Sequence, residues 1–274
     1  MNATQDGVPH ADIGVIGSTG LYSLLSDATE LTVSTPYGDP SDALTVGTVD
    51  GRRVAFLPRH GRTHALPPHR INYRANLWAL RSLGVRQVIA PCAVGSLRRE
   101  LGPGTLVVPD QVVDRTAGRP STYFDDVVSH VSFADPYCDT GRAAVLKAGA
   151  EGGAAAPVDG GTMVVIEGPR FSSRAESQWY AAAGWSLVNM TGMPEAALAR
   201  ELALCYTSVA LVTDLDAGID AEESVSQEEV YRVFSRSVGG LRDLILRTVV
   251  ELPEQRSCRC ARALDGVEAP FLTE

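Results

Sequence analysis

The chain has fewer basic than acidic residues, which limits the kinds of molecule that it can bind. Its 274 residues carry 24 Lys and Arg against 33 Asp and Glu, a formal net charge of -9. Such a balance argues against nucleic acid or an anionic membrane as a partner, since both need a basic surface. A small anionic substrate stays possible, because charges are screened beyond about 10 Å and a local group of Arg, His and backbone N–H groups can bind one.

The sequence also lacks a long hydrophobic run. No stretch approaches the roughly 18 apolar residues of a membrane-spanning helix, and residues 1–12 are mostly polar, without the apolar segment of a signal peptide. We therefore expect a cytoplasmic protein with no membrane partner. With 45% hydrophobic and 21% charged residues, the chain can bury a sizeable core.

Cysteine is scarce as well, with five residues in the chain. Cys92, Cys138 and Cys205 lie in or beside apolar segments, as small hydrophobic residues do in a reducing compartment. Cys258 and Cys260 form a C-x-C pair without a second pair or a nearby His, a pattern that is weak as a metal site. We expect free thiols here and no metal, with a disulfide in the tail as the first alternative.

Apolar strands and amphipathic helices alternate along the chain, which predicts α/β architecture with a central mixed, mostly parallel twisted sheet flanked by helices. We expect one domain over 12–252, a flexible N-terminus over 1–11 and an irregular C-terminal tail over 253–274. Asp50-Gly51 predicts a two-residue hairpin turn. The predicted strands are 12–17, 44–49, 52–58, 85–91, 106–108, 163–166, 186–188 and 209–216, and the predicted helices are 72–83, 194–205 and about 25 residues from Val225.

Two carboxylates close the last of these strands. Asp214 and Asp216 share a face, because alternate side chains of a strand point the same way. Ligands of open α/β sheets bind outside the carboxyl ends of strands, where this pair would meet one ligand. The alternative is a solvated strand end with an Asp-initiated turn.

Other strand ends carry groups that suit an anion. The loop 17–20, Gly-Ser-Thr-Gly, offers N–H groups and hydroxyls, although its glycine spacing is not that of a dinucleotide-binding loop. The loop 59–64 contains two Arg and two His, which suit phosphate. Small residues at 92–96 would let a ligand approach the backbone closely. Ordinary turns or solvated loops remain the alternative in each case.

Two further loops contain side chains that suit a nucleoside. Phe171 lies in a Gly-Pro loop beside hydroxyl groups and could hold its ring over a planar ligand, or equally belong to the core. Met190 and Met193 flank a Thr-Gly pair at the start of a helix; Met as a filler of core gaps is the usual alternative.

Five segments in order, each at a strand end, resemble the trimeric purine nucleoside phosphorylases. They are Gly17-Ser18-Thr19-Gly20, Arg59-His60-Gly61-Arg62, Ala93-Val94-Gly95-Ser96-Leu97, Glu167-Gly168-Pro169-Arg170-Phe171-Ser172 and Asn189-Met190-Thr191-Gly192-Met193-Pro194-Glu195. Segments 40–44, 59–62 and 171–177 are similar to the 5′-methylthioadenosine phosphorylase branch. The resemblance covers about residues 12–250.

This resemblance implies a nucleoside phosphorylase-like fold and phosphorolysis, with inorganic phosphate as co-substrate and no cofactor. It implies that Asp214 is catalytic and donates a proton to purine N7. His130 would reach into a neighbouring subunit's site, which implies a homotrimer. The residues implied to bind phosphate are Thr19, Arg59, His60, the Cys92-Ala93 turn and Thr191, and those implied to line the nucleoside site are Phe171, Ser172, Met190, Asp214, Asp216, Gln227, Val230, Tyr231 and His130.

The chemistry suits these residue types. As the glycosidic bond breaks, positive charge gathers on the ribose and negative charge on the purine, so an acid is needed at the base and an anion at the sugar. Two neighbouring carboxylates repel, which favours one of them keeping its proton near pH 7. A protonated carboxyl offers one donor and one acceptor, which match N7 and the amino group of a 6-aminopurine. Adenine is therefore the predicted base.

Some positions depart from the methylthioadenosine phosphorylase branch. Cys92 stands where that branch often has Thr, which removes one hydroxyl from the phosphate site, and Gly192-Met193 replaces a Thr-Val pair. Gln227 and Tyr231 fall where the branch places apolar residues around the 5′-methylthio group. Gln227 would hydrogen-bond a 5′-hydroxyl or accommodate another 5′ substituent. The alternative is that Gln227 turns to solvent and the methylthio group packs on Val230 and Phe171.

The predicted function is phosphorolysis of 5′-methylthioadenosine to adenine and 5-methylthioribose 1-phosphate, a step of purine salvage. Adenosine or another 5′-substituted 5′-deoxyadenosine is the alternative substrate. A nucleoside hydrolase and a nucleoside-binding protein are alternatives of other classes. A hydrolase would leave the phosphate-type loops without a role.

Overall fold

Two long strands, β5 (Gln87–Ser96) and β11 (Cys205–Leu215), form the centre of the sheet. They run parallel, with Cys205 opposite Gln87 at one end and Leu215 opposite Ser96 at the other. The sequence prediction ended the first of these strands at residue 91. That boundary was wrong, and Cys92 and Ala93 lie within β5 and not in a turn.

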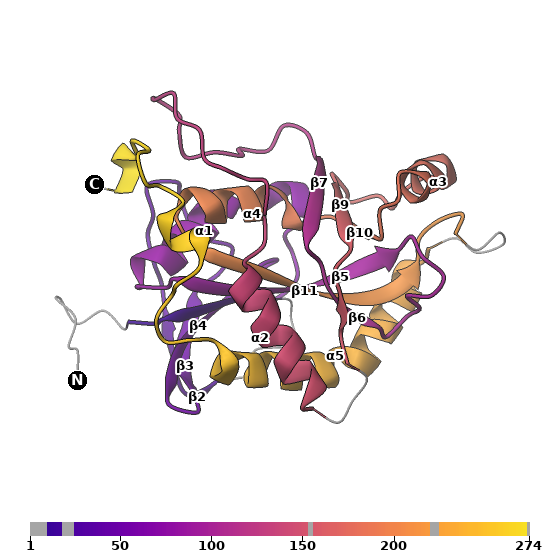
Figure 1. Cartoon of the computed structure of the whole chain (residues 1–274), viewed down its shortest axis with the longest axis horizontal. Coiled ribbons are helices and arrows are strands. Elements are labelled where there is room, and N and C mark those ends of the chain that lie inside the picture. The colour runs from indigo at the N-terminus through magenta and orange to yellow at the C-terminus, as the bar shows by residue number, and fades with distance from the viewer. Residues whose placement is uncertain (1–9, 18–24, 153–155, 220–224, 273–274) are drawn as a thin grey trace.

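The computed structural model describes residues 10–17, 25–152, 156–219 and 225–272. Its strands form an 11-stranded sheet with the order β2-β3-β4-β1-β5-β10-β9-β7, while β11 joins β5 to β6 and β8 pairs with β6 (Figure 1). The other strands are β1 (Ile13–Gly17), β2 (Ser26–Leu31), β3 (Leu44–Val49), β4 (Arg52–Pro58), β6 (Leu106–Val108), β7 (Gln111–Arg115), β8 (Val158–Asp159), β9 (Thr162–Ile166) and β10 (Leu187–Asn189).

Parallel pairs predominate among the described strands. Six of the ten pairings are parallel and four are antiparallel, which confirms the predicted mixed, mostly parallel sheet. The predicted hairpin is β3-β4. Its turn residues Asp50 and Gly51 have φ angles of 45° and 77°, the left-handed conformation that a two-residue hairpin turn requires.

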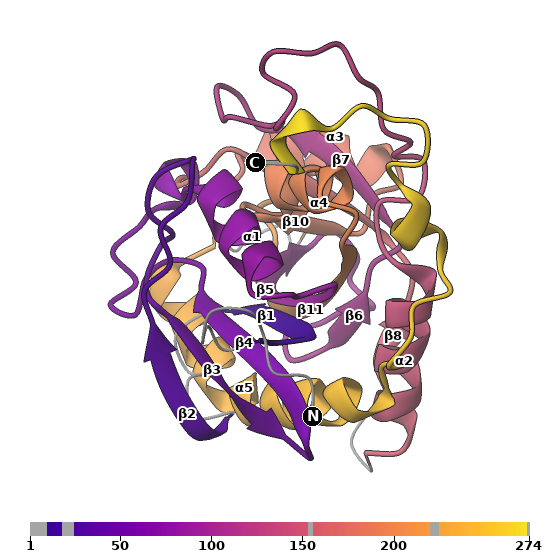
Figure 2. The ribbon, with the colours of Figure 1, turned by 90° about the vertical axis from the view of Figure 1, so that its left-hand side faces the viewer.

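Helices cover both faces of the sheet (Figure 1 and Figure 2). The helices α1 (Tyr73–Ser82) and α4 (Gly192–Glu201) pack together on one face, and α2 (Asp139–Ala150) and α5 (Gln227–Glu251) pack together on the other. The helix α3 (Arg174–Ala182) follows β9 in the chain. Short 3-10 turns occur at Pro68–Arg70, Arg259–Arg262 and Pro270–Leu272.

Polar side chains fix where the predicted helices begin. Asn72 accepts a hydrogen bond from Ala75 N at the start of α1, and Ser226 accepts one from Glu229 N at the start of α5. Both helices are confirmed within a residue or two. The predicted helix 194–205 is shorter than expected, because the backbone turns at Ala203, with a φ of 52°, and Cys205 already begins β11.

Side chains of a strand point alternately to the two faces of the sheet, so the core has two parts, one under each layer of helices. In β11, Val209 and Leu211 pack with α2 and α5, while Ala210 and Val212 face α1 and α4. Because β11 is covered on both faces, its middle reads as a continuous apolar run from Val209 to Val212. The two carboxylates follow where that cover ends.

The segment beyond Pro253 packs against the domain along much of its length. Phe271 is buried, and its ring stacks on Tyr123 at 5.4 Å and meets Phe124 edge-on at 5.0 Å. Cys258 and Cys260 are buried as well. Within the described ranges, no helix is both long and apolar enough to cross a bilayer.

Candidate functional site

Asp214 and Asp216 lie together over Gly95 of β5, as strand alternation predicts. A Cβ atom placed on Gly95 would meet Asp214 Oδ2 at 3.1 Å and Asp216 Oδ1 at 3.3 Å. Glycine therefore leaves the space that the two carboxylates occupy. The register of β11 against β5 shifts between Val212 and Asp214, an irregularity that re-aims side chains where it occurs.

The Asp214 carboxyl holds its proton more tightly than an ordinary aspartate. Burial raises its pKa to about 6, against a hydrogen bond from the Thr213 hydroxyl that lowers it, and the charges of Asp216 and Glu229 raise it further. The repulsion expected from the sequence is therefore present, but burial is the larger cause. Thr213 Oγ1 lies 2.7 Å from Asp214 Oδ1 and 3.2 Å from the Val94 carbonyl oxygen.

Asp216 is tied to α3 and is also buried. The Ser177 hydroxyl donates to Asp216 Oδ2 at 2.5 Å. Burial raises the pKa of Asp216, and the nearby hydroxyls of Ser177 and Ser172 lower it. Although Ser172 is close enough to act on Asp216, its buried Oγ has no hydrogen-bond partner of ordinary geometry among the described residues.

Arg59 is held by a carboxylate that the sequence analysis did not identify. Its Nε and Nη2 each donate to Glu195 at 2.8 Å, and its Nη1 donates to the Pro91 carbonyl oxygen at 2.9 Å. Both charged residues are buried, and Tyr206 also donates to Glu195, at 2.7 Å. Burial opposes the charged guanidinium, but the Glu195 carboxylate outweighs it and raises the pKa of Arg59. These contacts use three of the five guanidinium N–H groups and leave two for another acceptor.

His60 is a neutral ring whose free nitrogen is an acceptor. Its Nδ1 lies 2.8 Å from the Leu66 carbonyl oxygen, so Nδ1 carries the proton. Burial lowers the pKa of His60 to about 4, and the charge of Arg59 contributes in the same direction. A protonated histidine would donate to phosphate through both ring nitrogens. In this arrangement Nε2 accepts a hydrogen bond instead.

Asn189 holds the remaining phosphate candidates in place. Its Oδ1 accepts from Thr191 N at 2.8 Å and Gly192 N at 2.6 Å, and its Nδ2 donates to the Ala93 carbonyl oxygen at 3.1 Å. Because β10 runs antiparallel to β5, its carboxyl end reaches the middle of β5 at Ala93. Thr191 is therefore fixed beside the segment that contains Cys92 and Ala93.

The candidate site extends along β5. Pro91 and Ala93 contact Arg59 and Asn189, whereas Gly95 lies under the two carboxylates. Three residues of strand, from Cys92 to Gly95, span about 10 Å. Groups that can bind an anion therefore lie at one end of this stretch of β5, and a proton donor lies at the other end.

Met190 and Phe171 lie on loops that Arg119 joins. The Sδ of Met190 lies against Gly168, where a Cβ would approach it to 2.6 Å. Arg119 donates to the Met190 carbonyl oxygen at 3.0 Å and to that of Glu167 at 2.6 Å. Phe171, on the second of these loops, is 36% exposed, so its ring is not part of the core.

The first turns of α5 meet the basic loop through one aromatic contact, beside a stacked pair within the loop. His64 stacks on His60 with ring centroids 4.5 Å apart, and Tyr231 meets His64 edge-on at 6.3 Å. Gln227 lies four residues before Tyr231 and therefore on the same side of the helix. Gln227 and Tyr231 are exposed, and Val230 is half-buried.

One predicted residue lies apart from this group. His130 is exposed on the segment between β7 and α2, which stands out from the body of the molecule (Figure 1), and it lines a hollow with Arg200 and Arg259. Thr19 lies outside the described residues.

Glu195, Asn189 and Arg119 are the residues that the sequence analysis missed. Glu195 and Asn189 belong to the segment 189–195 that carries the family resemblance, but no local pattern shows which residues they contact. A buried Arg needs a carboxylate partner, which was the only signal that pointed to Glu195. Nothing in the sequence around Arg119 pointed to its role.

Comparison with known proteins places the chain in a family. A model of the phosphorylase superfamily matches residues 12–250. The chain belongs to this superfamily. The resemblance noted in the sequence is thereby confirmed, and the enzyme class follows from it.

Relatives that are similar to the chain include a purine nucleoside phosphorylase and S-methyl-5′-thioadenosine phosphorylases. A purine nucleoside phosphorylase of Streptomyces coelicolor is 65% identical over 269 residues, 94% of this chain and 96% of the relative. An S-methyl-5′-thioadenosine phosphorylase of Mycolicibacterium smegmatis is 56% identical over 260 residues, 94% and 98% of the two chains. A solved methylthioadenosine phosphorylase from an antarctic soil metagenomic library has a TM-score of 0.89 and 40% identity, covering 94% of this chain and 92% of that one.

The raised pKa of Asp214 predicts a pH-dependent cost in stability. A carboxyl with a pKa of about 6 in the folded state and 3.8 when unfolded binds more protons when folded, so the free energy of unfolding falls as pH rises through this window. Asp214→Asn removes the titration. We expect the stability of the variant relative to wild type to increase by about 1 kcal/mol between pH 5 and pH 8.

Chemical denaturation at the two pH values measures this difference. Asp243→Asn, on the exposed side of α5, is the matched control and should show no such change. An equal effect of pH on wild type and Asp214→Asn would show that Asp214 is not protonated in the way its burial indicates.

Proposed function

We propose that the protein catalyses phosphorolysis of 5′-methylthioadenosine to adenine and 5-methylthioribose 1-phosphate. The observation that carries this proposal is the buried Asp214 carboxyl over Gly95, on the same strand as the groups that surround Arg59 and Asn189. Proton donor and anion site are then separated by about three strand residues. The relatives named as S-methyl-5′-thioadenosine phosphorylases support the same reaction.

At the base, Asp214 donates its proton to purine N7 as the glycosidic bond breaks. The leaving base then departs neutral instead of as an anion. Asp216, held by Ser177, accepts from the exocyclic amine or fixes Asp214, and the unpartnered Ser172 hydroxyl supplies a further contact to the base. A 6-aminopurine matches this set of donors and acceptors.

At the other end of this stretch of β5, phosphate is held by the charge of Arg59, by hydrogen bonds donated to its oxygens and by one hydrogen bond that it donates. The two unused N–H groups of Arg59, the Thr191 hydroxyl and the Ala93 backbone donate to its oxygens, with Thr19 as a further donor. Neutral His60 accepts at Nε2 from a protonated phosphate oxygen. The bound phosphate attacks the ribose carbon from which the base departs, and no other cofactor takes part.

The sugar lies between these two ends. Met190 and Phe171 line it, and the first turns of α5 provide Gln227, Val230 and Tyr231 at its 5′ side. The exposed Tyr231 contacts His64, which stacks on His60, so α5 begins close to the phosphate end. Closure over a substrate would bring its exposed side chains onto the 5′ group.

Adenosine is the second candidate substrate, and two observations favour it. Gln227 is a polar residue on the side of α5 that carries Tyr231, where a methylthio group would prefer apolar contacts. The 65% identical relative is named a purine nucleoside phosphorylase. A 5′-hydroxyl would use the Gln227 amide.

We propose further that the enzyme is a homotrimer of the cytoplasm. His130 lies on the projecting segment and is exposed, and the nearby Val128 is 92% exposed. A second subunit that packs on this segment would bury the apolar Val128 side chain. His130 would then complete the neighbour's nucleoside site. The five free cysteines suit a reducing compartment.

Adenine release from 5′-methylthioadenosine should depend on phosphate. We expect adenine and 5-methylthioribose 1-phosphate in equal amounts with phosphate present, and no turnover in chloride of the same ionic strength. Chromatography of the base and phosphorus NMR of the sugar product measure both. Base release at the same rate without phosphate would identify a hydrolase, and no release under either condition would identify a binding protein.

Asp214→Asn should change the preferred base. The variant lacks the acid, so turnover of 5′-methylthioadenosine should fall by about two to four decades. An amide also presents a donor to a 6-oxopurine, so turnover of inosine should rise relative to the adenine nucleoside. Specificity constants for both substrates, with Asp243→Asn as control, measure the effect; an unaltered base preference would remove Asp214 from this role.

Gln227→Val should favour the methylthio substrate. Valine offers apolar contact in place of the amide, so kcat/KM for 5′-methylthioadenosine relative to adenosine should rise, by up to about tenfold for one lost hydrogen bond. The ratio measured on wild type names the natural 5′ group. A wild type that prefers adenosine would replace the leading substrate by the second one, and a ratio that Gln227→Val leaves unchanged would show that this side chain turns to solvent.

A further inference from the structure

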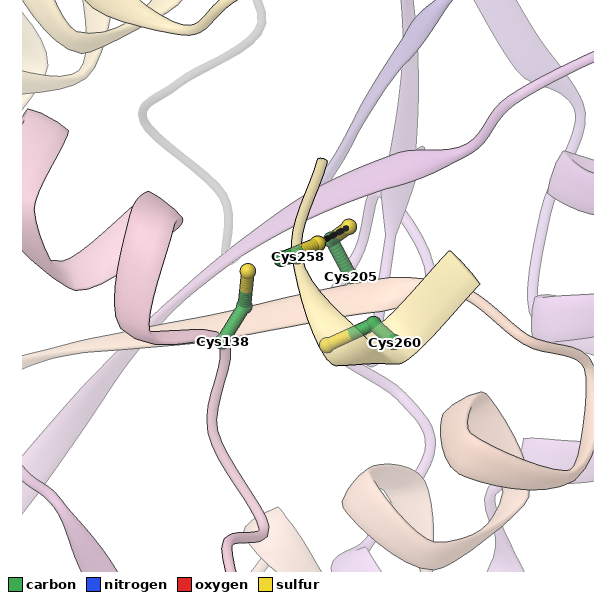
Figure 3. Close-up of side chains that lie close together, drawn as sticks. All are labelled: Cys138, Cys205, Cys258 and Cys260. Atoms are coloured by element: carbon green, nitrogen blue, oxygen red, sulfur yellow. Dashed lines mark hydrogen bonds between the residues drawn. The ribbon is translucent and has the colours of Figure 1, made fainter. Parts of the chain in front are cut away.

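Four of the five cysteines meet at the amino end of β11, away from the site (Figure 3). Cys138 precedes α2, Cys205 begins β11, and Cys258 and Cys260 come from the C-terminal segment. All four are buried, and their Sγ atoms lie within 4.8 Å of one another. The C-x-C pair therefore has the second pair that the sequence did not show.

The spacing of the sulfur atoms is close to that of a tetrahedral thiolate site. Zinc–sulfur bonds of about 2.3 Å place the four sulfurs of such a site about 3.8 Å apart. Here the Cys205 and Cys258 sulfurs are 3.2 Å apart and no pair of the four exceeds 4.8 Å. Small side-chain rotations would bring all four onto one ion, and no backbone segment has to move far.

The surroundings suit the net negative charge of four thiolates on a divalent ion. Gly141 N donates to Cys138 Sγ at 3.4 Å, at the positive end of α2. Arg256 Nη1 lies 3.9 Å from Cys205 Sγ.

We propose that Cys138, Cys205, Cys258 and Cys260 bind a structural zinc ion. Four thiolates fill a tetrahedral ion completely, so the site has no open position for chemistry. It lies about 30 Å from the carboxylates, since nine residues of β11 separate Cys205 from Asp214. The ion joins the C-terminal segment to the start of β11 and the start of α2.

The ion would fix a segment that has little regular structure. Between Leu252 and the last described residue, only two 3-10 turns occur, and Phe271 supplies the apolar contact at the far end. A zinc ion bound by Cys258 and Cys260 would attach this segment to the domain at a second point, before Phe271. Since β11 carries Asp214 at its other end, the ion also anchors the strand on which the site is built.

Metal content of the full-length protein tests the proposal directly. We expect about one zinc per chain by mass spectrometric metal analysis when the protein is prepared under reducing conditions. Cys260→Ser should lose this zinc, whereas Cys92→Ser, which alters the one cysteine outside the cluster, should keep it. Cobalt in place of zinc should give the thiolate charge-transfer and tetrahedral ligand-field bands, and these bands should be absent from Cys260→Ser.

A second measurement does not depend on the variants folding. Removing zinc from wild type with a chelator should lower Tm, make the four thiols reactive, and be reversed by one equivalent of zinc. Reduced wild type that takes up no zinc after loading would overturn the proposal. So would an intact mass smaller by the four hydrogens of two disulfides under these conditions, or iron in place of zinc.

Discussion

The parallel pairing of β5 with β11 is the constraint on which the site depends. It sets Asp214 and Asp216 over Gly95, and the glycine leaves them room because a Cβ there would crowd both carboxylates. The same strand, four and two residues earlier, carries the positions that Arg59 and Asn189 contact. A shift of the pairing by one residue would turn the carboxylates to the other face of the sheet, since side chains alternate.

Burial gives the site its chemistry. A carboxyl that is shielded from water keeps its proton to a pKa of about 6, and an imidazole that is shielded from water loses its proton at about 4. The same shielding makes an isolated Arg59 costly, and Glu195 offsets that cost with two hydrogen bonds. Burial thus accounts for the protonated Asp214, the neutral His60 and the pairing of Arg59 with Glu195.

Much of this arrangement could be predicted from local sequence. The hairpin at Asp50-Gly51, the helix that begins after Asn72 and the long helix before Pro253 follow from turn chemistry, capping and periodicity. The paired aspartates follow from alternation. The boundary of β5 could not be predicted, because small residues such as Ala93 and Gly95 give no strand signal, and they extend the strand only because β11 and β10 pair with them.

By itself, the sequence determined eight of the described strands, three of the described helices, the loops at the strand ends and the common face of Asp214 and Asp216; it did not show β2, β7, β8, α2 or α3. The features that it determined follow from contacts between residues that are near in the chain. Only the tertiary structure decided which distant groups meet: Glu195 with Arg59, Asn189 with Ala93, and Cys138 and Cys205 with the C-x-C pair. Such partners come together through sheet pairing and helix packing, and residues far apart in sequence leave no local pattern that could predict them.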